Sequence, residues 1–159
     1  MKKNEFEKIL EIDSLNSLAY CNLGSVYNNL NDMIKAEKEW KKAIECEKDI
    51  VRAKRREAPE GELKYILAVV KEPASFRAHL YLGMLYLEQN LNSKALEELK
   101  QATALEPDNP DPYFGLGRIC QNRSNTEKAI YNYEKYLYLG GKEEEEVKEI
   151  LKFLKNNKH

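Results

Sequence analysis

Apolar side chains between residues 79 and 107 recur at the spacing of α-helices. A first stripe has large side chains at positions i, i+3 and i+7, which form one helical face: His79, Leu82 and Tyr86. A second stripe alternates small and large side chains: Ala95, Leu99 and Ala102. Asn92 precedes the second stripe and is the expected N-cap of its helix. Pro107 cannot continue a helix, so the pattern predicts two helices that end at this proline.

The same order of residues occurs twice more along the chain. Gly83, on the first stripe, recurs as Gly117, 34 residues later, and as Gly24, 59 residues earlier. The large residue of the second stripe recurs in the same register: Trp40, Leu99 and Tyr133. A side chain at the glycine would push the two helices apart, so we expect the paired helix to come closest there. Such a pair cannot bury its apolar stripes alone, so successive pairs must stack.

A 34-residue period with this order of large, small and aromatic positions resembles the tetratricopeptide repeat family. The resemblance implies an all-α fold, namely a right-handed α-solenoid of antiparallel helix pairs (a TPR-like superhelix) with a C-terminal capping helix. Residues 142–159 fit the capping helix, because they are apolar on one side and highly charged on the other. The apolar stripe of this helix consists of Val147, Ile150, Leu151 and Leu154.

The repeat register divides the chain within a single domain, 1–159. We expect a partial repeat at 1–16, regular repeats at 17–50, 76–109 and 110–141, a degenerate repeat at 51–75 and the capping helix at 142–159. The stretch from 50 to 75 is too short for a regular repeat. Either its first helix is short, over about 50–57, or the preceding helix runs on to Glu57.

The N-terminal segment matches only the second half of a repeat. Its apolar residues have the spacing of second-helix positions: Phe6, Ile9 and Ile12. The matching first helix is missing, which would leave an apolar face uncovered. We therefore expect a truncated chain or a processed fragment, and any targeting signal could lie further upstream. The uncovered segment 4–12 could also support self-association.

Net charge indicates which classes of partner the chain can attract, and the cysteine content indicates its compartment. The 26 basic and 27 acidic residues leave a net charge of −1, which gives no general attraction to nucleic acid or to an anionic membrane. No apolar run approaches the ~18 residues of a membrane span. The three cysteines are far apart and odd in number, which favours a reducing compartment such as the cytoplasm. One of them, Cys120, occupies a position that tyrosine fills in the other two repeats, so we expect it in helix packing or in the groove lining.

The sequence contains no recognisable catalytic or cofactor-binding motif. Cysteines at metal-ligand spacing, a glycine-rich phosphate loop and a nucleophile elbow are all missing. His79 takes a core position of its repeat, and His159 is terminal. We therefore expect neither an enzyme nor a bound cofactor or metal. A basic cluster is a candidate anion patch, but glutamates follow it directly, so a solvated helix end is the simpler interpretation: Arg52, Lys54, Arg55 and Arg56.

The family resemblance places the binding surface on the first helices of the repeats, which line a concave groove. Carried onto this chain, the groove positions are Asn22, Ser25, Asn28, Asn29, Leu80, Tyr81, Met84, Glu88, Phe114, Arg118, Gln121 and Asn122. Leu80, Met84 and Phe114 are apolar where the repeat core does not require it, so they form a candidate contact patch. The alternative is that Leu80 and Met84 pack between neighbouring first helices. A subgroup that holds chaperone tails has Lys and Asn where this chain has Cys21 and Ser25, which argues against that ligand.

These observations favour a non-enzymatic module that binds a peptide segment of a partner protein in its groove. Two alternatives stay open. One is a self-assembling scaffold whose repeats stack end to end through the partial repeat. The other is a regulatory part of a larger protein.

Overall fold

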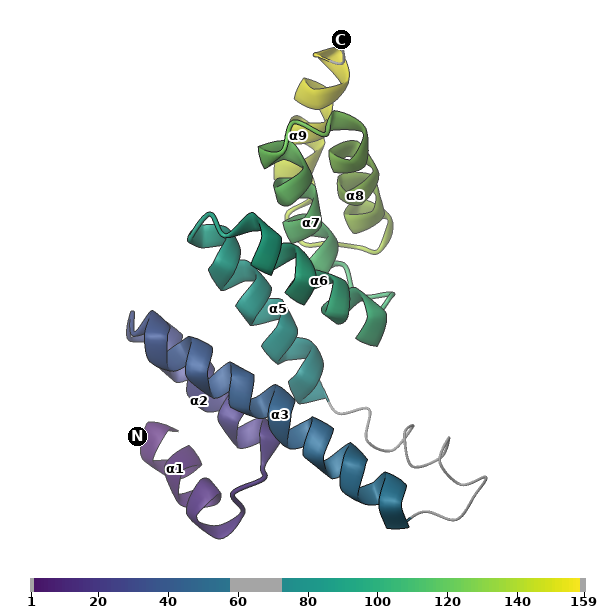
Figure 1. Ribbon diagram of the computed structural model, residues 1–159. Helices are drawn as coiled ribbons and strands as arrows, with labels where there is room; N and C mark the ends of the chain where they lie inside the picture. Colours follow the sequence, from purple (N-terminus) through teal and green to yellow (C-terminus); the bar gives the residue numbers. More distant parts are fainter. Residues whose placement is uncertain (1, 58–72, 158–159) are drawn as a thin grey trace. The chain divides into compact units, whose positions relative to one another are not determined.

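The computed structural model describes residues 2–57 and 73–157, and all regular structure in these two ranges is α-helical (Figure 1). The helices are α1 (Lys2–Ile12), α2 (Ser17–Asn29), α3 (Met33–Glu57), α5 (Pro73–Glu88), α6 (Asn92–Leu105), α7 (Asp111–Asn122), α8 (Thr126–Tyr138) and α9 (Glu144–Asn156). The predicted all-α class, built of helix pairs, is confirmed. The degenerate repeat expected at 51–75 falls mostly on 58–72, which lie outside the described residues. Before that gap, α3 continues without a break to Glu57, which is the second of the two alternatives.

The chain forms two compact units, Met1–Leu82 and Gly83–His159, with the boundary inside α5. We call them the N-terminal and the C-terminal unit. In the N-terminal unit, α2 packs against both α1 and α3. The indole Nε1 of Trp40 on α3 donates a hydrogen bond to the backbone oxygen of Cys21, at 3.1 Å. A Cβ on Gly24 would lie only 2.5 Å from Cδ1 of the same indole, so α2 and α3 meet at this glycine as the repeat pattern predicts.

The C-terminal unit repeats this contact twice. A Cβ on Gly83 of α5 would lie 2.6 Å from Cγ of Leu99 on α6, and one on Gly117 of α7 would lie 2.7 Å from Cε1 of Tyr133 on α8. Leu99 and Tyr133 are both fully buried. The unit therefore has two helix pairs, α5 with α6 and α7 with α8, and each is held by a large side chain against a glycine.

The last helix, α9, packs on α8. Its buried stripe is the predicted one, with Ile150 only partly buried: Val147, Leu151 and Leu154. The buried Tyr136 of α8 holds the connection, because its hydroxyl donates to the carboxylate of Glu143 and accepts from the Glu143 backbone N–H at 2.9 Å. Three glutamates fill the first turn of α9, where negative charge complements the helix dipole.

The same turn ends each first helix and also α8. In each turn, one residue has a positive φ: Asn31 (63°), Asn90 (59°), Ser124 (55°) and Gly140 (80°). After α2, the N–H of Asp32 donates to the oxygen of Tyr27 at 2.9 Å, and the N–H of Asn31 donates to the oxygen of Asn28, also at 2.9 Å. This pair of bonds defines a Schellman motif, which satisfies the last carbonyls of a helix and reverses the chain.

The N-cap residue of α6 differs from the one predicted from the sequence. Asn92 is not the N-cap, because the cap position is taken by Leu91, whose side chain makes no capping bond. In the other two pairs that position holds Asp32 and Asn125, whose side chains accept from Lys35 N and Lys128 N. The Schellman turn after α5 ends at Leu91, and the Leu91 oxygen already accepts from the Ala95 N–H, so Asn92 lies inside the helix.

Candidate protein-binding surfaces

In the N-terminal unit, α2 carries four of the predicted groove residues. Asn22, Ser25 and Asn28 are half-buried, and Asn29 is exposed. The Ser25 hydroxyl donates to the backbone oxygen of Cys21 at 3.2 Å, so its proton is used inside the helix. The asparagine amides remain the donors and acceptors that this face of α2 can offer a ligand.

The first turns of α5 carry two more predicted groove residues, also in the N-terminal unit. Leu80 is only 8% exposed, so this side chain is part of the core and offers no contact surface. The burial of Leu80 removes it from the predicted contact patch, because helical periodicity identifies a face but not what already covers it. Tyr81 is 37% exposed, and its ring lies 5.3 Å from that of Trp40.

Met84 and Phe114 are the apolar groove residues of the C-terminal unit, and both are half-buried. The sulfur of Met84 lies 3.2 Å from the point where a Cβ on Gly115 would sit, so Met84 of α5 covers this glycine of α7. The ring of Phe114 packs against Tyr133 and Tyr136, with centroids 6.1 and 5.5 Å apart. Each residue therefore divides its surface between the core and the outside.

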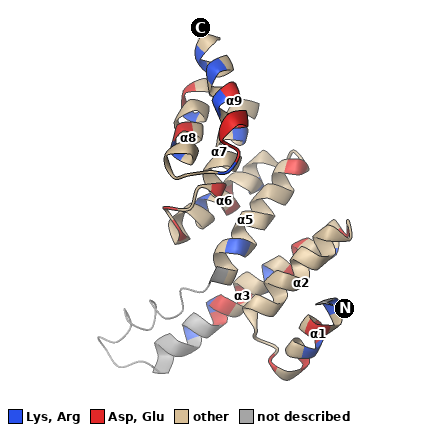
Figure 2. Ribbon diagram, turned by 180° about the vertical axis from the view of Figure 1, so that it is seen from behind, with Lys and Arg blue, Asp and Glu red and all other residues tan. Residues whose placement is uncertain are grey.

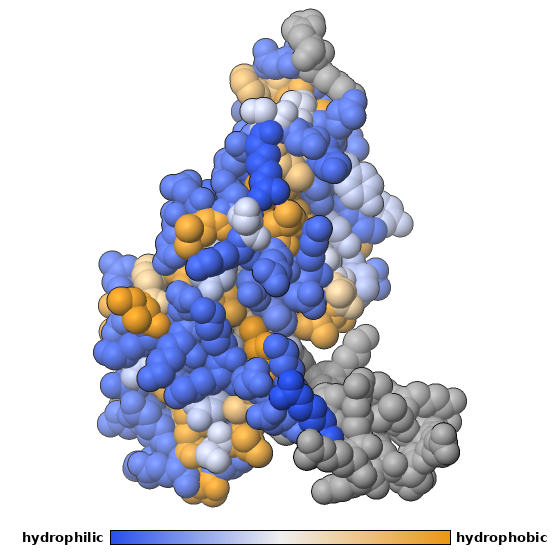
Figure 3. All heavy atoms as spheres, viewed as in Figure 1, coloured by the Kyte–Doolittle hydropathy of each residue, from blue (hydrophilic) through white to orange (hydrophobic). Residues whose placement is uncertain are grey.

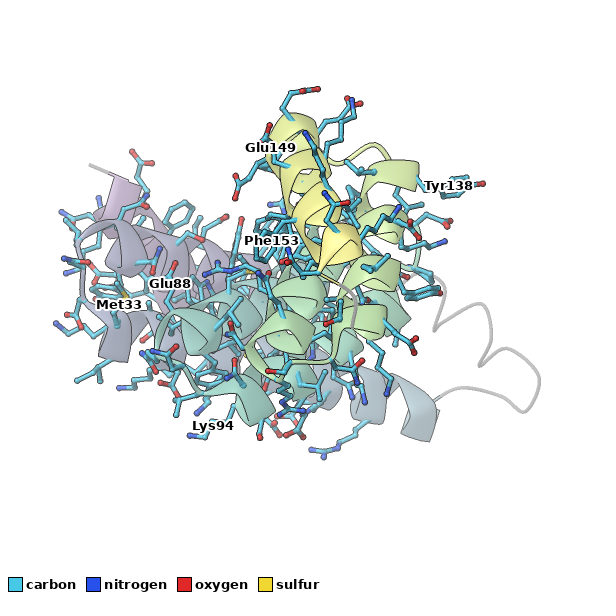
Figure 4. All side chains as sticks on the ribbon, turned by 90° about the horizontal axis from the view of Figure 1, so that it is seen from above. Met33, Glu88, Lys94, Tyr138, Glu149 and Phe153 are labelled. Carbon is cyan, nitrogen blue, oxygen red and sulfur yellow. The ribbon has the colours of Figure 1, made fainter. Side chains whose placement is uncertain are left out.

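Four polar residues of α5 and α7 complete the predicted set, and all are exposed: Glu88, Arg118, Gln121 and Asn122. Glu88 ends α5 (Figure 4). Two of the side chains are held by neighbouring helices. The Tyr133 hydroxyl donates to Oε1 of Gln121 at 3.0 Å, and Nδ2 of Asn122 donates to Oδ1 of Asn92 at 3.2 Å. These bonds fix the orientation of amides that sequence reasoning placed in the groove without any partner.

Charged groups of both signs lie along α8 and α9 (Figure 2). Ion pairs join them within and between these helices, as in Lys148–Glu144 at 2.6 Å and Lys155–Glu134 at 2.7 Å. In the N-terminal unit, Arg52 of the candidate anion patch forms an ion pair with Asp49, with 3.0 Å between Nη1 and Oδ1. The side chains of the other three basic residues in that cluster lie outside the described part of the chain. Exposed ion pairs of this kind contribute little stability.

The cysteines do not have the environment of reactive thiols. Burial raises the pKa of Cys21 to about 11, and it also raises the pKa of Cys46 and of Cys120 above the ordinary value. Nucleophilic cysteines need a lowered pKa. Across 2–57 and 73–157, no group of three His, Cys, Asp or Glu side chains is placed to hold a metal ion. None of the helices described is long and apolar enough to cross a membrane.

Comparison with known proteins identifies the repeats. Residues 83–122 match the family model described as TPR repeat, and residues 5–38 match the one described as tetratricopeptide repeat. A search of curated proteins found no significant match.

Several solved structures resemble the chain at low identity. A tetratricopeptide repeat protein from Parabacteroides merdae is 18% identical over 96% of this chain and 62% of its own, with a TM-score of 0.47. PilW, a type IV pilus biogenesis factor, is 22% identical over 84% of this chain and 66% of its own, with a TM-score of 0.42. MamA is 19% identical over 92% of this chain and 89% of its own, with a TM-score of 0.43. The chain thus spans less than two thirds of the length of the Parabacteroides merdae protein and of PilW.

Both family models describe the same repeat, and each covers glycines of the helix contacts described above, Gly24 in one and Gly83 with Gly117 in the other. Repeats of this kind form protein-interaction modules. The chain therefore carries tetratricopeptide repeats over residues 5–38 and 83–122.

Proposed function

We propose that this protein is a non-enzymatic module that binds a segment of a partner protein on the first helices of its repeats. In the C-terminal unit the binding residues are Met84, Glu88, Phe114, Arg118, Gln121 and Asn122, which we call the α5–α7 surface. The observation that carries the proposal is that Met84 and Phe114 remain half-buried, beside exposed polar residues on the same helices.

This arrangement suits a ligand with an apolar anchor and a polar backbone. A few buried contacts usually dominate the binding energy of an interface, and a polar rim surrounds them. Met84 is unbranched and polarisable, so it can adapt its shape to an incoming side chain. The amides of Gln121 and Asn122 are held by Tyr133 and Asn92, so less side-chain freedom is lost when a ligand binds.

The N-terminal unit offers a second part of the surface on α2 and α5. Asn22, Asn28 and Asn29 supply both donors and acceptors, which can pair with the backbone of a bound segment. Tyr81 adds a partly exposed ring, supported from behind by Trp40. Ser25 contributes least, because its hydroxyl is bonded to Cys21.

The test is to identify a partner by affinity capture and then to titrate the purified partner against the protein and two variants. Met84→Glu places a charge at the anchor and should weaken binding by at least about tenfold, which is ~1.4 kcal/mol. Gln101→Glu, on the exposed side of α6, adds the same charge elsewhere in the unit and should bind as the wild type does. Equal affinities for all three proteins would place the binding surface elsewhere.

Self-association is the second candidate, and exposed apolar residues near α1 favour it (Figure 3). Four large aliphatic side chains within ten residues of sequence are well exposed: Ile9 (40%), Ile12 (89%), Leu15 (50%) and Leu18 (43%). Sedimentation at increasing protein concentration would detect the oligomer. Ile12→Lys should then restore the monomer, whereas a wild type that stays monomeric at all concentrations would exclude this function.

A further inference from the structure

A cavity of about 310 Å³ opens among α6, α7 and α8, entirely within the C-terminal unit. Its volume is at the lower end of the ~300–1,000 Å³ typical of ligand pockets. Its apolar lining comes from α6 and α7: Leu96, Leu116 and Ile119. The thiol of Cys120 also faces it. The proposed function above does not use this cavity.

Cys120, which lines the cavity, takes the register position that a tyrosine holds in the other two repeats. Cys120 is 34 residues after Tyr86, and Tyr86 is 59 residues after Tyr27, so the three share one register position. Tyr86 is 3% exposed and fills its site. A cysteine is much smaller than a tyrosine, so the third repeat leaves the equivalent space open.

The third repeat keeps the lysine that lies beside the tyrosine ring in each of the other two repeats. Lys35 Nζ lies 5.4 Å from the ring centroid of Tyr27, and Lys94 Nζ lies 5.4 Å from that of Tyr86. These are cation–π distances. Lys128 occupies the same register position in the third repeat and lines the cavity beside Cys120. The third repeat thus keeps the cation and lacks the ring beneath it.

The cavity is also positively charged. Lys100, Arg123 and Lys128 line it, and none of its lining residues is acidic. Arg123 is held in place by a bond from Nη2 to the Ser93 hydroxyl, at 3.1 Å. Asn132 donates from Nδ2 to the Lys128 oxygen at 2.7 Å and approaches Sγ of Cys120 at 3.8 Å.

The cavity and the α5–α7 surface lie on opposite faces of α7. Phe114, Arg118 and Gln121 recur at the spacing of one helical face. Leu116, Ile119 and Cys120 fall about half a turn away from them. One helix can therefore serve both surfaces, and a ligand on one face leaves the other accessible.

We propose that this cavity binds an aromatic side chain from an acidic segment of a partner protein. The ring takes the space that tyrosine fills in the other repeats, over the apolar lining and beside Lys128. Carboxylates that flank the ring in the ligand complement the three cations at the opening. The aromatic ring fills the cavity, and the acidic residues beside it make binding selective for negatively charged segments.

The probe is a fluorescently labelled, end-blocked peptide with one tyrosine between pairs of glutamates, titrated by fluorescence polarisation. Saturable binding should appear below about 1 mM. Cys120→Tyr fills the cavity with the residue used by the other repeats and should weaken binding at least about tenfold, with an unchanged or raised melting temperature. Cys120→Ser keeps the space and is the matched control. Lys128→Gln, at an exposed position, should weaken binding without affecting the fold.

Two further measurements locate the ligand. A peptide with alanine in place of the tyrosine should lose binding, and saturating peptide should slow the alkylation of Cys120 by N-ethylmaleimide. The proposal is overturned by any of three results: no saturable binding, equal binding to Cys120→Tyr, or equal binding of the alanine peptide. None of these results depends on the α5–α7 surface, so failure here leaves the proposed function standing.

Discussion

Gly83 and Leu99 touch so closely that a single added carbon would not fit between them. A Cβ on Gly83 would lie 2.6 Å from Cγ and 2.7 Å from Cδ2 of Leu99, and 3.4 Å from the Leu99 backbone nitrogen. Leu99 also covers Gly115 of α7, where the equivalent distance to Cδ1 is 2.6 Å. One leucine therefore sets the spacing of three helices in the C-terminal unit.

Gly83→Ala should destabilise the protein by ~1–3 kcal/mol, because the added methyl group overpacks this contact. Leu99→Ala alone should cost ~2–5 kcal/mol through the cavity it leaves. Together the two changes should cost less than the sum of the single effects, because the smaller residue 99 makes room for the methyl group. Urea unfolding of the four proteins measures this coupling. Strict additivity would mean that the two residues do not meet in solution.

Leu91→Asp should stabilise α6 by ~0.5–1 kcal/mol, because it introduces the capping side chain that Asp32 and Asn125 provide in the other pairs. Leu91→Ala is the matched control, since it removes the same apolar side chain without adding a cap. The difference in melting temperature between these two variants isolates the capping bond. A lower melting temperature for the aspartate variant than for the alanine variant would contradict the assigned helix start.

Tyr133 should make the protein sensitive to alkali. Burial raises the pKa of its hydroxyl from 10.0 to about 12, so the folded state holds this proton more tightly than the unfolded chain. The resulting stability is fully present below pH 10.0 and is lost as the pH rises to about 12. Tyr133→Phe has no such proton, so its unfolding free energy should fall less steeply over this range.

Urea unfolding between these pH values tests this dependence. Tyr131→Phe is the control, because Tyr131 is 64% exposed and should follow the wild type. Cys21 also titrates in this range but does so in all three proteins. Parallel curves for wild type and Tyr133→Phe would show that Tyr133 is not buried in solution.

The two proposed surfaces should respond differently to salt. The α5–α7 surface carries both Glu88 and Arg118, so affinity for its partner should fall only modestly as ionic strength rises. The cavity has three cations and no carboxylate in its lining, so binding of the acidic peptide should weaken steeply under the same conditions. Titrations of each ligand at low and high sodium chloride make the comparison. Equal slopes would mean that charge does not distinguish the two surfaces.

Much of this architecture could be predicted from spacing alone. The glycines at 24, 83 and 117 each face the large residue that the repeat register assigned to them. Such contacts are predictable because they lie within one repeat and depend on helical periodicity.

The errors concern contacts that periodicity does not specify. Asn92 was expected as a cap because its residue type suits one, but the turn geometry places Leu91 there. The burial of Leu80 depends on what packs over its helix, which sequence spacing does not give. The cavity at Cys120 had a detectable signal, namely a small residue in a tyrosine position, although one of its cations, Lys100, comes from the preceding helix pair.

Trp40 gives the protein a built-in optical reporter. It is the only tryptophan in the sequence and is buried in the N-terminal unit, 2% exposed. Its fluorescence emission should therefore follow the unfolding of that unit alone, whereas far-ultraviolet circular dichroism follows the helices of both units. Coincident transitions by the two probes would indicate one cooperative unfolding step. Separate transitions would give the stability of each unit from a single unmodified sample.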